Sequence, residues 1–208
     1  MRGFIVIFLA CATTGIAAAL WKADVERGST VAVFGAGMVG LGAVVGAKMK
    51  GAERIIVVDP SAKRRELALQ FGATEVFAGG SNGAAEVIEA TAGLGADYTF
   101  EATGRVDVMG QAVEAARLGW GKCTILGVAG RGEKLEIIPR FLITGRTVLG
   151  GSFGGAKGRT QVPLLVDMYM RGELELDGFV SHYLTLDEVN RGFDLMHKQD
   201  GIRSVITF

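Results

Sequence analysis

This 208-residue sequence has few cysteines and prolines, and neither sign of charge is in excess. The two cysteines, Cys11 and Cys123, exclude a disulfide framework, and so small a number fits a reducing compartment such as the cytoplasm. Basic and acidic side chains number 22 each, so no charged field favours binding to nucleic acid or to an anionic membrane. We therefore expect small molecules or other subunits as partners.

Glycine, in contrast, is abundant, and only three prolines accompany it. The 32 glycines are roughly twice the ~7% usage of average proteins. No low-complexity tract accompanies them, so they favour tight turns and close approaches of the backbone over a flexible linker. A chain of this length buries roughly 70% of its unfolded surface, which is enough for a real core.

The N-terminal stretch 3–21 contains no charged residue. A basic residue precedes it, and the "LAC" at 9–11 is similar to a secretory or lipoprotein signal, while about 18 apolar residues suffice for a membrane span. Against export, two threonines and a glycine interrupt the run, and the sequence predicts a capped helix that begins at Thr13 or Thr14. From these residues alone, export and a place in a protein core both stay open.

From residue 30 onward, short β-branched runs alternate with helical patterns. The strand candidates are 30–34, 54–59, 74–78, 97–102, 123–128 and 147–152. The helix candidates between the first five strands are 38–50, 61–71, 83–91 and 106–118. Continuous apolar strands that alternate with helices predict a parallel sheet covered on both faces. We therefore expect an α/β fold with a doubly wound, six-stranded parallel Rossmann sheet.

After the sixth strand the pattern changes to a glycine-rich loop followed by mixed elements. We expect a helix over 160–171, a strand over 178–186 and a closing strand over 203–208. Between these two strands, Thr185 and Glu188 form a capping box for a further helix. A tail of roughly 55 residues is too small for an independent domain, so we expect it to pack on something else.

The motif Gly35-x-Gly37-x-x-Gly40 directly follows the first strand and begins the next helix. Gly35 lets the chain turn sharply, Gly37 leaves room for a pyrophosphate, and Gly40 allows the helix to lie close to the strand. The free N–H groups at the helix N-terminus favour the negative charge of a diphosphate. The order of strand, glycine loop, helix and strand predicts a dinucleotide-binding site.

Asp59 ends the second strand, 19 residues beyond Gly40. A carboxylate at this position accepts hydrogen bonds from the ribose 2′ and 3′ hydroxyls of adenosine, and its charge repels a 2′-phosphate. The sequence therefore favours NAD over NADP. The alternative is that Asp59 only caps the helix that starts near Ser61.

Two other motifs suggest different chemistry. Residues 150–154 match GxSxG, the nucleophile elbow of serine hydrolases, with Ser152 as the nucleophile. An elbow needs a helix immediately after the serine, whereas this chain continues into further glycines. A Walker-type phosphate loop around Lys157 lacks the required flanking residues. Both motifs are therefore weak candidates.

The histidines and cysteines are few and far apart. His182 lies in an expected strand and His197 near an expected helix end, where a cation is favourable. Two histidines and two cysteines do not predict a self-contained metal site. Cys123, inside a strand, is expected to be a small buried hydrophobic residue.

Four segments, residues 11–48, 100–109, 143–163 and 193–208, resemble the zinc-containing medium-chain alcohol dehydrogenases. The last two are most similar to the class III branch, the S-(hydroxymethyl)glutathione dehydrogenases, and the similarity is collinear over residues 9–208. The resemblance implies NAD-dependent oxidation of a primary alcohol or of S-(hydroxymethyl)glutathione. It also implies a zinc ion that acts as a Lewis acid on the alcohol oxygen.

The resemblance also assigns parts of the site residue by residue. Cys11 matches a cysteine ligand of the catalytic zinc, and Thr14 matches a threonine beside the nicotinamide ring. Asp59 and Arg64 match the pair that holds the adenosine ribose, and Arg203 matches an arginine that reaches the pyrophosphate. The pyrophosphate loop corresponds to Gly35, Gly37, Met38, Val39 and Gly40, and the surroundings of the nicotinamide to Leu126, Val128, Gly151 and Phe153.

The resemblance divides the chain into three parts. It implies a remnant of the catalytic domain and the start of a connecting helix at 1–21, an NAD-binding domain at 22–154, and a C-terminal segment of the catalytic domain at 155–208. On this basis the apolar run from Leu9 onward belongs to a protein core, which favours the cytoplasm over export.

The similarity begins about halfway along a typical member, so we expect the other zinc ligands to be missing. One cysteine cannot hold zinc in a closed tetrahedral set. The chain is therefore expected to keep its dehydrogenase ancestry and to be inactive alone; a non-catalytic NAD-binding or interaction module is the alternative. In the family, the sheet edge at 147–152 pairs with its twin, which implies a homodimer.

Overall fold

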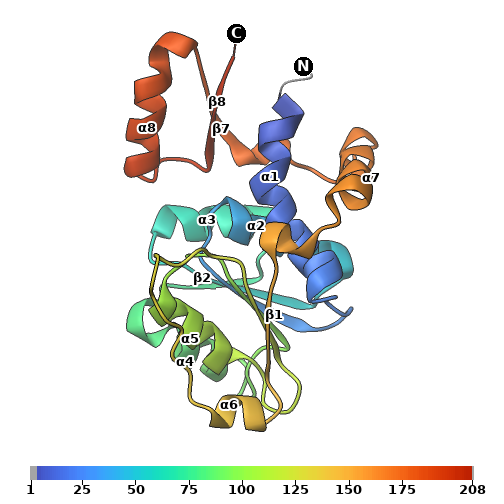
Figure 1. Ribbon diagram of the computed structural model, residues 1–208, viewed down its shortest axis with the longest axis vertical. Coiled ribbons are helices and arrows are strands. Elements are labelled where there is room, and N and C mark those ends of the chain that lie inside the picture. The colour runs from blue at the N-terminus through green and yellow to red at the C-terminus, as the bar shows by residue number, and fades with distance from the viewer. Residues whose placement is uncertain (1–3, 208) are drawn as a thin grey trace. The chain divides into compact units, whose positions relative to one another are not determined.

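The computed structural model describes residues 4–207, and these form two compact units. One unit comprises residues 10–156, and the other comprises the rest of the described chain. Figure 1 shows the first unit as a sheet with helices on both of its faces. Within the described residues, no helix is both long enough and apolar enough to cross a membrane.

The larger unit contains a six-stranded parallel sheet in the order β3-β2-β1-β4-β5-β6. Its strands are β1 (Thr30–Phe34), β2 (Arg54–Val58), β3 (Glu75–Phe77), β4 (Tyr98–Glu101), β5 (Lys122–Ile125) and β6 (Thr147–Gly150). Its helices after β1 are α2 (Met38–Lys50), α3 (Ala62–Phe71), α4 (Gly83–Ala90), α5 (Val106–Ala115) and the short α6 (Arg140–Ile143). The first strand lies inside the sheet, with later strands added on both sides, which confirms the doubly wound α/β fold.

Helices cover the two faces of the sheet through separate apolar contacts. Val87 of α4 and Val113 of α5 are fully buried in one core with Phe34 of β1. The opposite face carries α2, which packs beside α3, and Val33 Cγ1 of β1 lies close to the backbone of α2 at Gly40. Because neighbouring strand residues point to opposite faces, strands buried on both sides are continuously apolar, as the sequence predicted.

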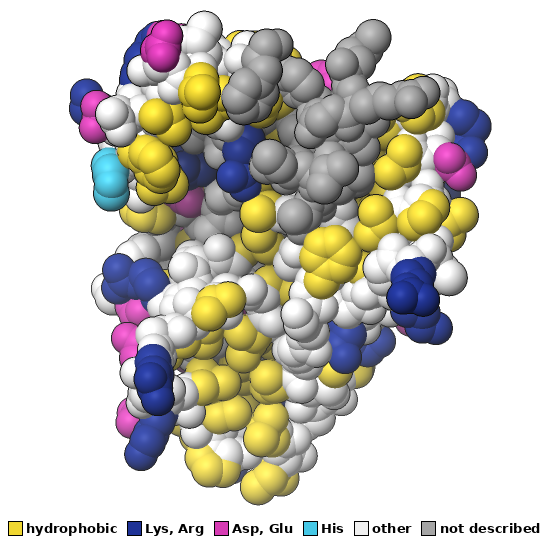
Figure 2. All heavy atoms as spheres, turned by 45° about the horizontal axis from the view of Figure 1, so that its top comes forward, with side chains coloured by type: hydrophobic (Ala, Val, Ile, Leu, Met, Phe, Trp, Pro, Cys, Tyr) yellow, Lys and Arg dark blue, Asp and Glu magenta, His cyan; other side chains and the backbone are white. Residues whose placement is uncertain are grey.

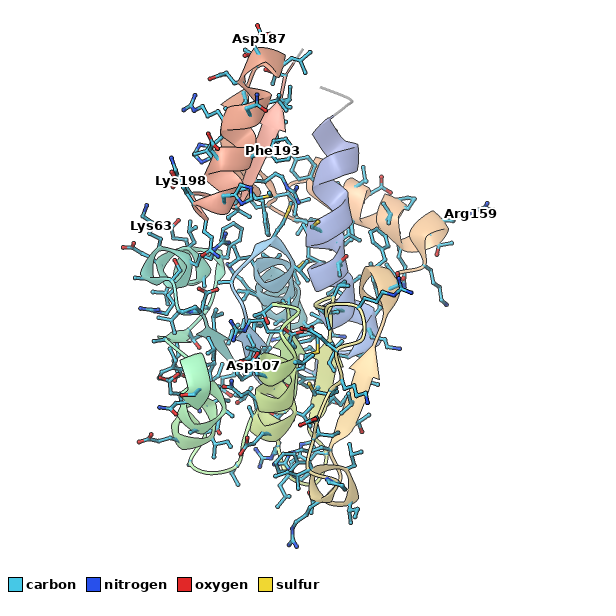
Figure 3. All side chains as sticks on the ribbon, turned by 60° about the vertical axis from the view of Figure 1, so that its left-hand side comes forward. Lys63, Asp107, Arg159, Asp187, Phe193 and Lys198 are labelled. Atoms are coloured by element: carbon cyan, nitrogen blue, oxygen red, sulfur yellow. The ribbon has the colours of Figure 1, made fainter. Side chains whose placement is uncertain are left out.

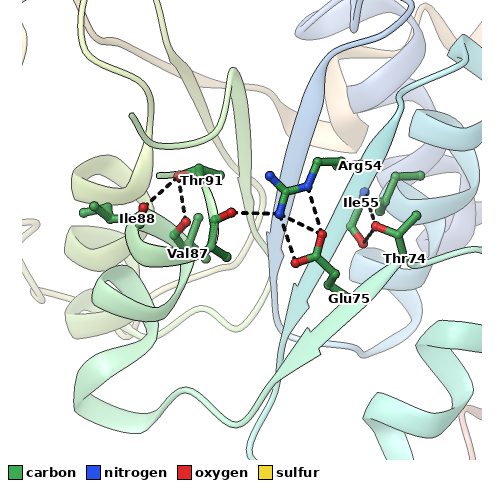
Figure 4. Close-up of polar contacts among 8 residues, drawn as sticks. Arg54, Ile55, Thr74, Glu75, Val87, Ile88 and Thr91 are labelled. Atoms are coloured by element: carbon green, nitrogen blue, oxygen red, sulfur yellow. Dashed lines mark hydrogen bonds and ion pairs between the residues drawn. The ribbon is translucent and has the colours of Figure 1, made fainter. Parts of the chain in front are cut away.

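A polar contact ties the outer strands to α4. The Arg54 guanidinium on β2 donates to both carboxylate oxygens of Glu75 on β3, at 2.9 and 3.0 Å, and to the carbonyl of Ala90 at 2.8 Å (Figure 4). On the next residue, the backbone N–H of Ile55 donates to Thr74 Oγ1 at 2.9 Å. These bonds are partly exposed, so they fix the register of the edge strand more than they add to stability.

The prediction that a capped helix begins at Thr13 or Thr14 is wrong. Helix α1 spans Phe4–Ala17 and continues as one π-helical stretch, η1 (Ala18–Lys22), so both threonines are interior residues. Gly15 does not end the helix; it lies where α1 contacts α2. A β-carbon at Gly15 would lie 1.9 Å from the carbonyl oxygen of Val39 on α2, so a larger residue would not fit. The close approach of α1 to α2 explains the glycine.

Two predicted boundaries also shift by a few residues. Helix α5 ends at Ala115, and not at 118, because Ala116 is extended and forms an isolated bridge with Ala96. Strand β5 ends at Ile125, so residues 126–128 lie in a loop beyond the sheet. This loop becomes available for contacts at the carboxyl end of the strands.

The second unit contains α7 (Gly158–Met170), the parallel strand pair β7 (Val180–Leu184) and β8 (Arg203–Ile206), and α8 (Val189–His197). The predicted capping box is confirmed: Thr185 N–H donates to Glu188 Oε2 at 3.0 Å. Asp187 precedes α8 and Phe193 lies on it, as the labels in Figure 3 show. Phe193 is half exposed, so part of the apolar stripe of this helix faces outward.

Candidate functional site

In the larger unit, the carboxyl ends of the parallel strands lie along one edge of the sheet. Loops follow β1 at 35–37, β2 at 59–61, β4 at 102–104, β5 at 126–128 and β6 at 151–155. The chain leaves β1 toward β2 on one side and reaches β4 on the other side, so the sheet has its switch point beside β1. In open α/β sheets, the crevice outside the strand ends at this point is where ligands bind.

The three motif glycines each have a distinct structural reason. Gly35 has φ +96°, and its N–H donates to Val58 O at 2.8 Å, so it makes the turn after β1. A β-carbon on Gly40 would lie 1.8 Å from the carbonyl oxygen of Gly35, so only glycine lets α2 begin this close to the strand. A β-carbon on Gly37, by contrast, would meet nothing within 4 Å.

Gly37 therefore lies at the open side of the loop. It is the N-cap of α2, and no side chain caps the helix there. Of its two successors in the motif, Met38 is buried and Val39 is half buried. A helix N-terminus without a side-chain cap, bordered by a glycine with free space, is suited to an anionic ligand such as a pyrophosphate.

Asp59 and Arg64 hold the same residue of the glycine loop, Ala36, through its two flanking peptide groups. Asp59 is 7% exposed, and its Oδ2 accepts from the N–H of Ala36 at 2.8 Å. The guanidinium of Arg64 donates to the carbonyl of Ala36 at 3.1 Å. Asp59 Oδ1 also accepts from the N–H of Ser61, the N-cap residue of α3, at 2.8 Å, so the aspartate holds the turn before the helix without capping its first turn. This contact and ribose binding are compatible, because each carboxylate oxygen accepts more than one hydrogen bond.

Glu101, at the end of β4, is a fully buried carboxylate that the sequence analysis did not single out. Its Oε1 accepts three hydrogen bonds from the next loop: 2.6 Å from Thr103 N–H, 2.5 Å from the Thr103 hydroxyl and 2.9 Å from Gly104 N–H. Its Oε2 is buried and has no hydrogen-bond partner among residues 4–207. In the sequence, the only sign of it is an acid that follows Phe100 at the end of the predicted strand 97–102.

The loops after β5 and β6 place the remaining candidates. Leu126 is half buried, and its N–H donates to the carbonyl of Glu101 at 2.8 Å, whereas Val128 is 91% exposed. In the turn after β6, Phe153 has φ +58° and a β-carbon on Gly154 would lie 2.0 Å from the carbonyl oxygen of Thr14. This contact sets Thr14 beside the turn that contains Gly151 and Phe153.

The same turn disfavours the hydrolase interpretation. The residues after Ser152 form a 3₁₀ turn, η3 (Ser152–Gly155), and α7 begins only at Gly158. A nucleophile elbow requires the serine to sit at a strand-to-helix turn, so this geometry does not present Ser152 as an activated nucleophile.

Comparison with known proteins identifies the family. A family model described as "Zinc-binding dehydrogenase" matches residues 38–170. The chain belongs to this family. "Alcohol dehydrogenase class-3" of Cereibacter sphaeroides is 42% identical over 213 residues, which span 98% of this chain and 56% of that protein. "S-(hydroxymethyl)glutathione dehydrogenase" of Synechocystis sp. is 45% identical over 206 residues, with the same coverage of 98% and 56%.

Solved structures of the zinc-binding dehydrogenase family agree with this fold. Benzyl alcohol dehydrogenase from Acinetobacter calcoaceticus superposes with a TM-score of 0.89 at 30% identity, over 96% of this chain and 55% of that one. Alcohol dehydrogenase TADH from Thermus sp. ATN1 superposes with a TM-score of 0.85 at 27% identity, over 98% of this chain and 59% of that one. The predicted resemblance is confirmed, and the chain spans about half the length of these relatives.

The zinc site of this dehydrogenase family is incomplete within residues 4–207. Cys11 is half buried, and no group of three His, Cys, Asp or Glu side chains in the described part could hold a metal ion. Cys123 is fully buried in β5, and burial raises the pKa of its thiol to about 12, so it is the expected inert hydrophobic residue. Arg203 lies on β8 in the other unit, and its role toward a pyrophosphate stays a prediction.

Proposed function

We propose that this chain binds NAD and is the coenzyme-binding part of an alcohol dehydrogenase that oxidises a primary alcohol or S-(hydroxymethyl)glutathione. One observation supports this most: an uncapped helix N-terminus with free space at Gly37 stands beside the buried carboxylate of Asp59. The first feature suits a pyrophosphate, and the second suits the hydroxyls of an adenosine ribose. We also propose the cytoplasm as its place in the cell.

The described residues fit NAD and do not fit zinc. When bound, NAD supplies the acceptor for the hydride that leaves the alcohol carbon. The chain's own residues bind the pyrophosphate at 35–40, bind the ribose through Asp59 and Arg64, and surround the nicotinamide from the loops 126–128 and 151–153. Among the described residues, Cys11 alone does not form a closed zinc site.

We expect replacement of Asp59 by alanine to weaken NAD binding by at least about tenfold, which corresponds to ~1.4 kcal/mol. The variant removes an acceptor for the ribose hydroxyls and also frees the N–H of Ala36. Isothermal titration calorimetry of the 208-residue chain measures the effect. Asp107→Ala is the matched control, because that carboxylate is exposed on α5 and forms an ion pair with Arg105. Equal NAD affinity in the wild type and in Asp59→Ala would contradict the proposed coenzyme site.

A non-catalytic NAD-binding module is the second candidate, and the incomplete zinc set favours it for the chain alone. It predicts NAD binding without any NADH formed from benzyl alcohol or S-(hydroxymethyl)glutathione, with or without added zinc. Absorbance at the NADH band measures this. A zinc-dependent rise with either alcohol would reject the module and support catalysis by the chain.

We further propose a homodimer that forms at the open edge of the sheet. β6 is an edge strand, and the neighbouring segment exposes Ile138, Leu142 and Ile143. Figure 2 shows hydrophobic side chains gathered at the lower end of one face, the end at which α6 lies in Figure 1. A bare apolar edge favours pairing with another chain.

Light scattering after size-exclusion chromatography is expected to give twice the mass of the chain. Thr147→Lys places a charge on the exposed edge and should shift the protein toward monomer, because pairing at this edge would take the charge out of water. Thr160→Lys, on an exposed site of α7, is the control and should leave the mass unchanged. A wild-type monomer at all concentrations tested would contradict the dimer.

A further inference from the structure

We infer that Glu101 is a positioning residue that fixes the loops around the nicotinamide half of the coenzyme. The inference rests on the proposed NAD binding and concerns a residue that touches the loops and not the reacting atoms. It follows from four observations: the complete burial of the carboxylate, its three hydrogen bonds to one loop, its contact with a second loop, and its oxygen that has no partner.

The first loop depends on Glu101 for its conformation. Residues 102–104 follow β4, and the three donors on Glu101 Oε1 all come from Thr103 and Gly104. Gly104 has φ +79°, a conformation that glycine adopts readily and other residues rarely adopt. Hydrogen bonds to a carboxylate are shorter and about twice as strong as those to a neutral acceptor, so the charge holds this loop more firmly than an amide would.

The loop held by Glu101 contacts the loops on both sides. A β-carbon on Gly35 would lie 2.7 Å from Thr103 Cγ2, so Thr103 packs against the turn after β1. A β-carbon on Gly104 would lie 2.6 Å from the carbonyl oxygen of Val128, so Gly104 packs against the loop after β5. Thr103 meets Gly35 through a side-chain methyl group, whereas Gly104 meets the backbone of Val128, so a shift of Gly104 would move the loop after β5.

The second oxygen of Glu101 points to the loop after β5. A β-carbon on Gly127 would lie 2.6 Å from Oε2, so Gly127 leaves the room that this oxygen occupies. The carbonyl of Glu101 also accepts from the N–H groups of Leu126 and Gly127, at 2.8 and 3.1 Å. Glu101 thus joins the loops after β4 and β5 through its side chain and its backbone.

A buried carboxylate oxygen without a partner is unfavourable for stability, so stability alone does not account for this residue. An apolar residue would avoid the buried Oε2 but would leave the N–H groups of Thr103 and Gly104 without their acceptor. The shape of the loops 102–104 and 126–128 is what Glu101 provides, and the resemblance sets Leu126 and Val128 of the second loop beside the nicotinamide.

The test compares NADH with ADP-ribose, which lacks the nicotinamide, on the 208-residue chain. Glu101→Gln keeps the size and one acceptor but removes the charge and adds an amide N–H₂ against Gly127. We expect NADH affinity to fall at least tenfold, which corresponds to ~1.4 kcal/mol. ADP-ribose affinity is expected to change less than twofold, because the sites for its adenosine and pyrophosphate, at Asp59 and Gly35–Gly40, stay intact.

Two further variants keep the test decisive. Thr103→Val removes one hydrogen-bond donor to Glu101 at an exposed position, so the variant should fold. We expect its affinity for NADH to fall several-fold and its affinity for ADP-ribose to stay unchanged. Thr124→Val is the control, because Thr124 Oγ1 on β5 is also buried without a partner; we expect no change in the affinity for either ligand.

Unchanged NADH binding in both Glu101→Gln and Thr103→Val would overturn the inference. An equal loss for NADH and ADP-ribose in a folded variant would also overturn it, since the role would then be general. If the wild-type chain binds neither ligand, the proposed function itself fails.

Discussion

Gly37→Ala is expected to weaken NAD binding at least tenfold, which corresponds to ~1.4 kcal/mol, without any loss of stability. The added methyl group meets no protein atom within 4 Å, and the backbone at φ −78° and ψ −175° suits alanine. It would, however, occupy the open side of the loop where a pyrophosphate has to approach the N–H groups of α2. Calorimetric NAD titration and thermal unfolding of the same sample measure the two effects.

Gly40→Ala is the matched control in the same loop. We expect it to lower the free energy of unfolding, whereas Gly37→Ala should lower only the affinity for NAD. Its methyl group would lie 1.8 Å from the carbonyl oxygen of Gly35, so α2 and the strand must separate. Overpacking of this kind costs about 1–3 kcal/mol of unfolding free energy. If Gly37→Ala binds NAD as tightly as the wild type, the glycine loop does not hold the pyrophosphate. If both variants lose the same stability, the geometry assigned to Gly37 is wrong.

Gly15→Ala is expected to lower the free energy of unfolding by about 3 kcal/mol, the upper end of the usual cost of overpacking. A β-carbon there would lie 1.9 Å from Val39 O and 2.5 Å from Ala43 N, both backbone atoms of α2 that no side-chain rotation can move away. On the facing helix, Gly42 and Gly46 make similar contacts with Ala12 and Ile16. Urea unfolding followed by circular dichroism gives the difference.

Gly110→Ala provides the control within another helix of the same unit. Its β-carbon would meet only the carbonyl oxygen of Glu136 at 3.4 Å, so helix propensity dominates and stability should rise by up to ~1 kcal/mol. A Gly15→Ala variant as stable as the wild type would show that α1 and α2 do not cross at this distance. It would also remove the explanation for the threonine and glycine residues inside α1.

The sheet was predictable from the sequence because its strands and helices carry strong local signals. Five of the six strand candidates contain an observed strand and the sixth, 123–128, overlaps β5, while the helix predicted at 38–50 has the observed bounds of α2. Asp59 was recognised because its place relative to Gly40 follows from the length of one strand–helix–strand unit.

What the sequence did not reveal depends on contacts between distant segments. Thr13 and Gly15 suggest a helix start when considered alone, whereas their helix continues because Gly15 packs on Val39 of α2. Glu101 was missed since its donors come from a loop whose conformation no local pattern predicts. The short α6 lies in a polar and apolar mixture without clear periodicity, so no pattern indicated it.

Titration of the unmodified 208-residue chain with NAD and with NADP, under identical conditions, tests the central claim most directly. We predict one NAD site per chain and NADP binding at least tenfold weaker, or ~1.4 kcal/mol, because a 2′-phosphate would meet the buried carboxylate of Asp59. No heat of binding with NAD, or equal affinity for the two coenzymes, would contradict the account.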